Sequence, residues 1–170
     1  VEKAKFYVKE GDIFQVNLSQ RFGAEIGKDE SIELYRILRA INPSPFASLV
    51  HINDFKLISQ SPERLVRLKD GIADTRPIAG TRRLVKGNEV RNEELAMELK
   101  NDPKECAEHV MLVDLERNDI GKIAEFGTVE VDEFMVIERY SHVMHLVSNV
   151  KGVLRKDLDA FDLLKAMFPG

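Results

Sequence analysis

Several residue types and segments are scarce in this sequence, and each shortage excludes a class of protein. Its 170 residues include one cysteine, Cys106, which cannot form an internal disulfide, so we expect a cytoplasmic location. The longest apolar runs are four residues, whereas a membrane-spanning helix needs about 20, so no membrane segment is expected. Lysine and arginine number 25 against 29 aspartate and glutamate residues, a net charge of −4. This balance argues against nucleic-acid binding, which requires a basic face.

The rest of the composition is typical of a globular domain. Apolar residues make up 44 % and charged residues 32 % of the chain, and the length suits one domain. The first residue is valine, and the last three follow directly on a helical pattern. We therefore expect residues 1–170 to be part of a single, longer domain and to lack its N-terminal and C-terminal portions.

Local patterns predict an alternation of helices and strands. Residues 3–10 read as the end of a helix that stops at Gly11, and residues 32–41 carry apolar side chains at helical spacing. Residues that favour strands predict them at 13–18, 46–52, 56–59, 65–68 and 72–75. Turn residues at 53–54 and 69–71 predict hairpins between the later strands.

The second half of the chain continues this alternation. The charged segment 85–94 is predicted to be a loop that leads into a helix ending at Lys100. Asp102-Pro103 starts another helix, to about Asn118, because aspartate caps helices and proline suits their first turn. Strands are predicted at 129–131 and 138–154, followed by a helix capped by Asp157. The pattern predicts an α+β fold, a mostly antiparallel β-sandwich flanked by helices and truncated at both ends.

Two glutamates on the helix that begins at Pro103 form the first candidate site. Glu105 and Glu108 are three residues apart and share one helical face. They can simply point into water, the ordinary arrangement of two like charges. However, the helix is apolar over most of its circumference, which leaves little of it facing solvent, and a buried carboxylate pair needs a cation. Mg²⁺ binds to one or two protein carboxylates together with substrate oxygens, so the pattern predicts a magnesium site without naming a reaction.

Two histidines on the predicted strand 138–154 are further candidates. His142 and His145 are three residues apart, and the two-residue period of a strand places them on opposite faces. Either can be an ordinary core histidine, and either can hydrogen-bond or move a proton in a closed site. The spacing separates the two residues without choosing between them.

Two turns are candidate anion or cap sites. In the segment 76–83, backbone N–H groups around Gly80 and the hydroxyl of Thr81 can hold a carboxylate, unless the segment is only a basic surface turn. Ser61-Pro62-Glu63 is typical of a capped turn, with Glu63 at a helix start.

Ordered segments across the whole chain resemble the chorismate-utilising enzymes, specifically component I of anthranilate synthase and of aminodeoxychorismate (para-aminobenzoate) synthase. Motifs in a fixed order are far more specific than any one of them. The matching segments are GDIFQVNL at 11–18, NPSPF at 42–46, SPER at 61–64, TRPIAGT at 75–81, AEH at 107–109, VDLERNDIG at 113–121, ERYSHVMHLVS at 138–148 and FPG at 168–170.

The resemblance implies an enzyme that removes a hydroxyl from chorismate, adds ammonia to the ring and, for anthranilate, expels pyruvate. By similarity, Glu105 and Glu108 belong to a Mg²⁺ site that orients the ring carboxylate of the substrate. Glu63 corresponds to the acid that protonates the departing hydroxyl, and His145 to the active-site histidine near the ring. Gly80 and Thr81 correspond to contacts with a substrate carboxylate, and the implied partner is a glutamine amidotransferase subunit that supplies ammonia.

Two positions bear on the product. Isochorismate synthases carry a lysine base where this chain has Gln15, so the resemblance favours ammonia over water as the nucleophile. Many aminodeoxychorismate synthases use a lysine nucleophile where this chain has Ala79, and alanine cannot form that covalent bond. Ala79 therefore favours anthranilate, as does Tyr140-Ser141-His142. Residues 15–22, 61–64 and 168–170 look more like the aminodeoxychorismate relatives, so that product stays an alternative.

The resemblance also places further family motifs, including a second glutamate pair for Mg²⁺, beyond residue 170. We therefore expect the 170 residues alone to bind Mg²⁺ weakly and not to turn over chorismate. An alternative of another class is a non-catalytic module that pairs with an amidotransferase or another synthase subunit. Retention of Glu63, Glu105, Glu108 and His145 argues against that alternative.

Overall fold

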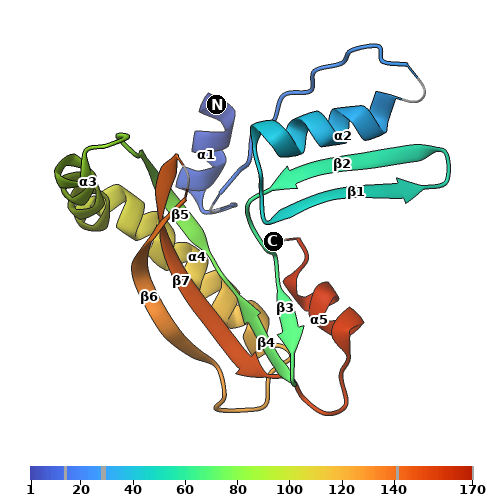
Figure 1. The fold of residues 1–170 in the computed structure, drawn as a ribbon. Coiled ribbons are helices and arrows are strands. Elements are labelled where there is room, and N and C mark those ends of the chain that lie inside the picture. Colours follow the sequence, from blue (N-terminus) through green and yellow to red (C-terminus); the bar gives the residue numbers. More distant parts are fainter. Residues whose placement is uncertain (14, 28–29, 141, 170) are drawn as a thin grey trace.

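The structure is a computed structural model that describes residues 1–13, 15–27, 30–140 and 142–169. Figure 1 shows a small sheet with one helix beside a larger sheet that is covered by longer helices. The elements in chain order are α1 (Glu2–Glu10), α2 (Glu30–Ile41), β1 (Phe46–Ile52), β2 (Phe55–Ser61), β3 (Arg67–Lys69), β4 (Ile72–Thr75), β5 (Ile78–Arg83), α3 (Glu89–Asn101), α4 (Pro103–Gly121), β6 (Glu130–Arg139), β7 (Val143–Val153) and α5 (Ala160–Met167).

The small sheet is the hairpin of β1 and β2. The two strands pair antiparallel from Phe46 opposite Ser61 to Ile52 opposite Phe55, and Asn53 in the connecting turn has a φ of 47°. Asparagine adopts this left-handed conformation more easily than most residues do. Helix α2 packs on both strands. The helix and hairpin predicted from the sequence are thus confirmed.

The larger sheet is built around β7. Its strand order is β3-β4-β7-β5, with β6 also paired to β7, and every pairing is antiparallel. Both edges of β7 are therefore hydrogen-bonded, and its residues 146–150 are all buried. Helix α4 packs on β5 and β7, while α3 lies against the same two strands nearer the start of β7 (Figure 1). The predicted α+β class with mostly antiparallel strands and flanking helices is confirmed.

Two apolar clusters hold the helices to this sheet. One joins α4 and α5 to β4 and β7, and its fully buried members include Ile120 and Val150. The other joins α3 to the first part of β7 through Leu99, Met144 and Leu146. Because both clusters use β7, this strand fixes the helices that flank it.

Two strand predictions are wrong. Residues 13 and 15–18 are not in a strand, and Phe14 lies outside the described residues. Val16 and Leu18 favour strands but are exposed, so their strand preference is not reinforced by burial. The predicted strand 138–154 is instead two strands, β6 and β7, which reverse after Arg139. Tyr140 N–H donates to Val143 O at 2.8 Å and closes that reversal. The residues of the reversal carry no glycine or proline that would mark a turn.

Two smaller corrections concern local geometry. The segment 76–83 is mainly the strand β5, with a bulge between Ala79 and Thr81, rather than a turn. The last helix is capped by Asp159, whose carboxylate accepts from the N–H groups of Phe161 and Asp162, and not by Asp157. Among the described residues, no helix is long and apolar enough to cross a membrane.

Candidate active site

The bulge in β5 brings this strand close to α4. Gly80 has a φ of 66°, a conformation that glycine adopts without steric cost. A Cβ atom built on Gly80 would lie 2.7 Å from Leu99 Cδ1 and 3.0 Å from Glu105 Oε2. The backbone at Gly80 therefore lies close to Leu99 and Glu105, and any side chain at residue 80 would clash with them.

His145 lies on β7 directly opposite Thr81 of β5. Its Nδ1 atom is 3.0 Å from the carbonyl oxygen of Gly80 and 3.1 Å from Thr81 Oγ1. A carbonyl oxygen only accepts hydrogen bonds, so Nδ1 carries the proton and donates to it. In the neutral ring Nε2 then holds the free lone pair, which makes Nε2 the atom that can accept a proton or hydrogen bond from a ligand.

The two predicted metal-binding glutamates lie in the first turns of α4. Asp102 caps this helix by accepting from the N–H groups of Lys104, at 3.0 Å, and Glu105, at 3.2 Å. Arg82 of β5 lies 2.9 Å from Asp102 and 3.4 Å from Glu105 Oε1. Both Glu105 and Glu108 are partly buried. Contrary to the expectation from its apolar composition, the helix also exposes Val110 and Leu115.

The chemistry of these carboxylates suits a hard divalent cation. Among the described residues, no group of three or more histidine, cysteine, aspartate or glutamate side chains is placed to hold a metal. Mg²⁺ does not need such a group, because it binds through one or two carboxylates and completes its coordination with water and substrate oxygens. Two carboxylates fit that requirement. Glu105 lies beside Gly80 of β5, and Glu108 lies one helical turn further along α4.

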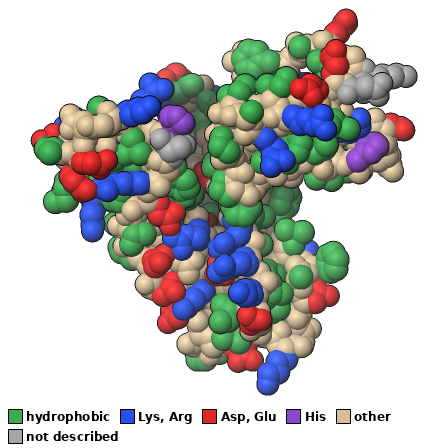
Figure 2. Space-filling model, in the orientation of Figure 1, with side chains coloured by type: hydrophobic (Ala, Val, Ile, Leu, Met, Phe, Trp, Pro, Cys, Tyr) green, Lys and Arg blue, Asp and Glu red, His purple; other side chains and the backbone are tan. Residues whose placement is uncertain are grey.

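Glu63 lies just after β2, in a turn that Ser61 closes. The Ser61 hydroxyl donates to Glu63 O at 3.1 Å, and Glu63 N–H donates to Ser61 Oγ at 3.3 Å. The next residue, Arg64, forms an ion pair with the buried Asp74 of β4, which ties this segment to the large sheet. Figure 2 shows basic side chains gathered with acidic ones over β3, β4 and β7.

Tyr140 links the Glu63 segment to His145. Glu63 and Tyr140 line the same small cavity, and the rings of Tyr140 and His145 meet edge-to-face at a centroid distance of 5.5 Å. The Tyr140 hydroxyl donates to Glu138 Oε2 at 2.7 Å, while the other Glu138 oxygen pairs with Arg76. Burial, with the neighbouring Glu138 carboxylate, raises the pKa of Tyr140 to about 12, so its hydroxyl keeps its proton at neutral pH.

Most predicted site residues lie in this one region. Gly80, Thr81, His145 and Glu105 are in direct contact with one another or with a shared neighbour. Ala79 is buried on β5 beside them.

Three predicted residues stand differently. Glu108 is the next carboxylate along α4, and Glu63 lines a cavity together with Tyr140, whose ring contacts that of His145. Gln15 is exposed, in a segment without helix or strand, and the described structure does not bring it to the other residues.

The sequence did not predict the contacts of Arg82 and Tyr140. Both fall within or beside segments that the resemblance singled out, and this was the available signal. Spacing along the chain does not reveal that Arg82 pairs with carboxylates 20 and 23 residues later. Nor does it reveal that Tyr140 packs on His145, because the strand break between β6 and β7 was not foreseen.

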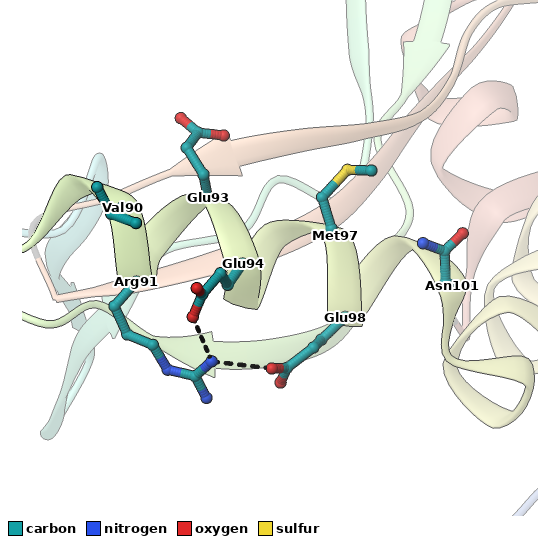
Figure 3. Close-up of a pocket in the computed structure, with 7 residues that line it drawn as sticks. All are labelled: Val90, Arg91, Glu93, Glu94, Met97, Glu98 and Asn101. Carbon is teal, nitrogen blue, oxygen red and sulfur yellow. Dashed lines mark hydrogen bonds and ion pairs between the residues drawn. The ribbon is translucent and has the colours of Figure 1, made fainter.

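A broad hollow along α3 is separate from these residues. Figure 3 shows its lining on α3, where Arg91 pairs with Glu94 and Glu98 along one side of the helix and the apolar side chains of Val90 and Met97 lie along the other. None of its lining residues belongs to the predicted site. This hollow therefore lies apart from the predicted site residues.

Comparisons with known proteins place this geometry in a family. Residues 1–170 match the family described as chorismate binding enzyme. Among the relatives are an anthranilate synthase component I-like protein of Synechocystis sp., 56 % identical over all of this chain and 35 % of its own, and aminodeoxychorismate synthase component 1 of Bacillus subtilis, 52 % identical over all of this chain and 36 % of its own.

A solved structure agrees with these relatives. The crystal structure of anthranilate synthase component I from Streptococcus pneumoniae superposes with a TM-score of 0.86 and 44 % identity, and the match covers 99 % of this chain and 36 % of that one. The chain thus spans about a third of the length of the proteins it matches. The chain belongs to the chorismate binding enzymes, an enzyme family with anthranilate and aminodeoxychorismate synthases among its members.

Proposed function

We propose that the protein is an anthranilate synthase component I, which aminates chorismate in the presence of Mg²⁺. Chorismate and ammonia give anthranilate, pyruvate and water. The observation that carries the proposal is the β5 bulge, where Gly80 lies close to Glu105 and His145 contacts Gly80 O and Thr81 Oγ1. Such a site offers carboxylate-binding groups beside a histidine and a metal-binding carboxylate, as a dicarboxylate substrate requires.

Each residue has a distinct task in this proposal. The Thr81 hydroxyl and the backbone at Gly80 bind a substrate carboxylate, because the Nδ1–H of His145 leaves the Thr81 proton free for a ligand. Glu105 and Glu108 would hold Mg²⁺, which when bound supplies positive charge to orient the ring carboxylate. Glu63 protonates the departing hydroxyl, since hydroxide is a poor leaving group. His145 Nε2 faces the ring as a proton acceptor.

The choice of product rests on Ala79. An alanine at this buried position of β5 offers no amine to form a covalent intermediate, which favours direct attack by ammonia and hence anthranilate. Gln15 in place of a lysine argues against activation of water. The alternative is an aminodeoxychorismate synthase component I, supported by a relative of that name at 52 % identity.

The partner and the location complete the proposal. The ammonia comes from a glutamine amidotransferase subunit, as the resemblance to component I enzymes implies. The reaction takes place in the cytoplasm, in keeping with Cys106 as the single cysteine, a free thiol.

Glu63→Gln in the full-length gene product tests the assigned acid. The variant removes the proton that the leaving hydroxyl needs, so chorismate consumption with ammonium should fall by about 100-fold or more. Binding of Mg²⁺, measured by calorimetry, should stay as in the wild type. Glu98→Gln on the outer face of α3 makes the same chemical change away from the site and should leave turnover intact. A Glu63→Gln variant with wild-type turnover would remove Glu63 from the mechanism.

A further inference from the structure

A buried hydrogen bond joins α4 directly to β7. His109 and Ser148 are both fully buried, and His109 Nε2 lies 2.6 Å from Ser148 Oγ. His109 is the residue after Glu108 and one helical turn after Glu105, while Ser148 lies three residues after His145 on β7. One short contact therefore connects the helix that carries the two glutamates with the strand that carries the histidine.

Ser148 also holds the neighbouring strand in an unusual conformation. Its Oγ atom accepts from Met135 N–H at 3.0 Å, and Met135 has a φ of 52° at an irregularity of the β6–β7 pairing. A methionine adopts this left-handed conformation only at a cost in free energy. The serine hydroxyl can donate its single proton to His109 Nε2 while it accepts from Met135, so it bridges three elements.

The bond is a costly way to fill this space. His109 Nδ1 is buried and has no hydrogen-bond partner in the described part of the chain. A buried polar atom without a partner reduces stability, whereas an apolar side chain of similar volume would not. What the pair provides instead is a fixed direction and distance between helix and strand, which apolar contacts leave adjustable.

We propose that His109 and Ser148 are positioning residues that hold Glu105 and Glu108 of α4 in register with His145 of β7. The inference rests on the proposed function, because that function assigns Mg²⁺ to Glu105 and Glu108. The His109–Ser148 bond would affect the reaction only by positioning these two carboxylates. When the bond is lost, α4 can shift or rotate on the sheet. The two glutamates then meet Mg²⁺ with poorer geometry, although neither glutamate has been altered.

Calorimetric titration of the full-length gene product with Mg²⁺, without chorismate, tests the inference. Ser148→Ala and His109→Leu should each weaken Mg²⁺ binding by about 10-fold, the usual effect of removing a group that orients metal ligands. The double variant should be no weaker than either single variant, because both remove the same bond. In His109→Gln the amide oxygen can take over the acceptor role of Nε2, and Mg²⁺ affinity should stay within about threefold of the wild type.

Val113→Ala is the matched control. Val113 is buried on the same helix one turn further from the glutamates, so its truncation destabilises the core without touching the bond. It should lower the thermal midpoint and leave Mg²⁺ binding unchanged. Ser148→Ala and His109→Leu with the wild-type Mg²⁺ affinity would overturn the inference, as would a wild type that does not bind Mg²⁺. A wild type that binds Mg²⁺ but leaves chorismate unchanged would instead contradict the proposed function alone.

Discussion

Gly80 is the residue at which the site tolerates least change. It combines a positive φ with a close approach to Leu99 and Glu105, so a side chain there meets backbone strain and a steric clash together. Because the added side chain would clash with the carboxylate of Glu105, the same substitution disturbs the proposed metal-binding group.

Gly80→Ala should therefore destabilise the protein by about 2–4 kcal/mol and lower chorismate turnover. Gly71→Ala is the control, because Gly71 has a similar φ of 77° but no neighbour within 4 Å of an added Cβ. It should cost only about 1 kcal/mol, and the difference between the two in urea unfolding isolates the clash. Equal losses in both variants would show that β5 and α4 do not meet at residue 80.

Glu116 makes stability depend on pH. Burial on α4 raises the pKa of this carboxyl group from 4.5 to about 7, with a smaller opposing effect from the Thr75 hydroxyl. The folded protein thus holds a proton on Glu116 between these two values while the unfolded chain does not. The contribution of Glu116 to stability is therefore lost as the pH rises through that interval and changes little above it.

Glu116→Gln should remove this loss. At about pH 8 the variant should be more stable than the wild type by about 1–3 kcal/mol, and at about pH 4.5 the two should be equal within error. Urea unfolding at both pH values measures the difference. Asp114→Asn, whose side chain is 79 % exposed on the same helix, changes the net charge equally and should show no such gain. A gain at low pH instead would reverse the assigned direction.

Candidate site residues could be chosen from the sequence where a motif contains them, but the tertiary contacts that surround them could not be predicted. Glu63, Gly80, Thr81, Glu105 and His145 stand in recognisable segments. The proton on His145 Nδ1 depends on a carbonyl group 65 residues away in the chain, and the raised pKa of Glu116 depends on burial. Both the position of the His145 proton and the pKa of Glu116 therefore depend on the folded structure.

At the scale of elements, local signals located most helices and hairpins. The Asp102-Pro103 start of α4 and the glycine stop after α1 were visible because capping uses residues close in sequence. The break between β6 and β7 was not visible, because both flanks favour strands. The bulge of β5 was not visible either, since its register is set by pairing with β7.

The cap of α5 shows the same limit and can be measured. Asp159 accepts from two N–H groups of the first turn, so Asp159→Ala should cost about 1 kcal/mol of unfolding free energy. Asp157, the cap expected from the sequence, instead lies 3.5 Å from Arg155 with 73 % of its side chain exposed. Asp157→Ala should cost less than about 0.5 kcal/mol. The reverse order would restore the sequence-based assignment.

At the scale of the whole molecule, β7 organises the chain. It pairs with β4, β5 and β6, carries His145 and Ser148, and supports α4 with its glutamates. The site therefore draws on segments from residue 63 to residue 148, and it forms only when those segments pack on one strand. Motif order along the sequence predicted the family, while the arrangement around β7 had to come from the structure.

The product formed from chorismate tests the proposed function most directly. The full-length gene product is incubated with chorismate, Mg²⁺ and ammonium, and the products are separated by chromatography with fluorescence detection while pyruvate is assayed in parallel. We expect anthranilate and pyruvate in equal amounts. Aminodeoxychorismate without pyruvate would contradict that expectation and assign the protein to the alternative synthase.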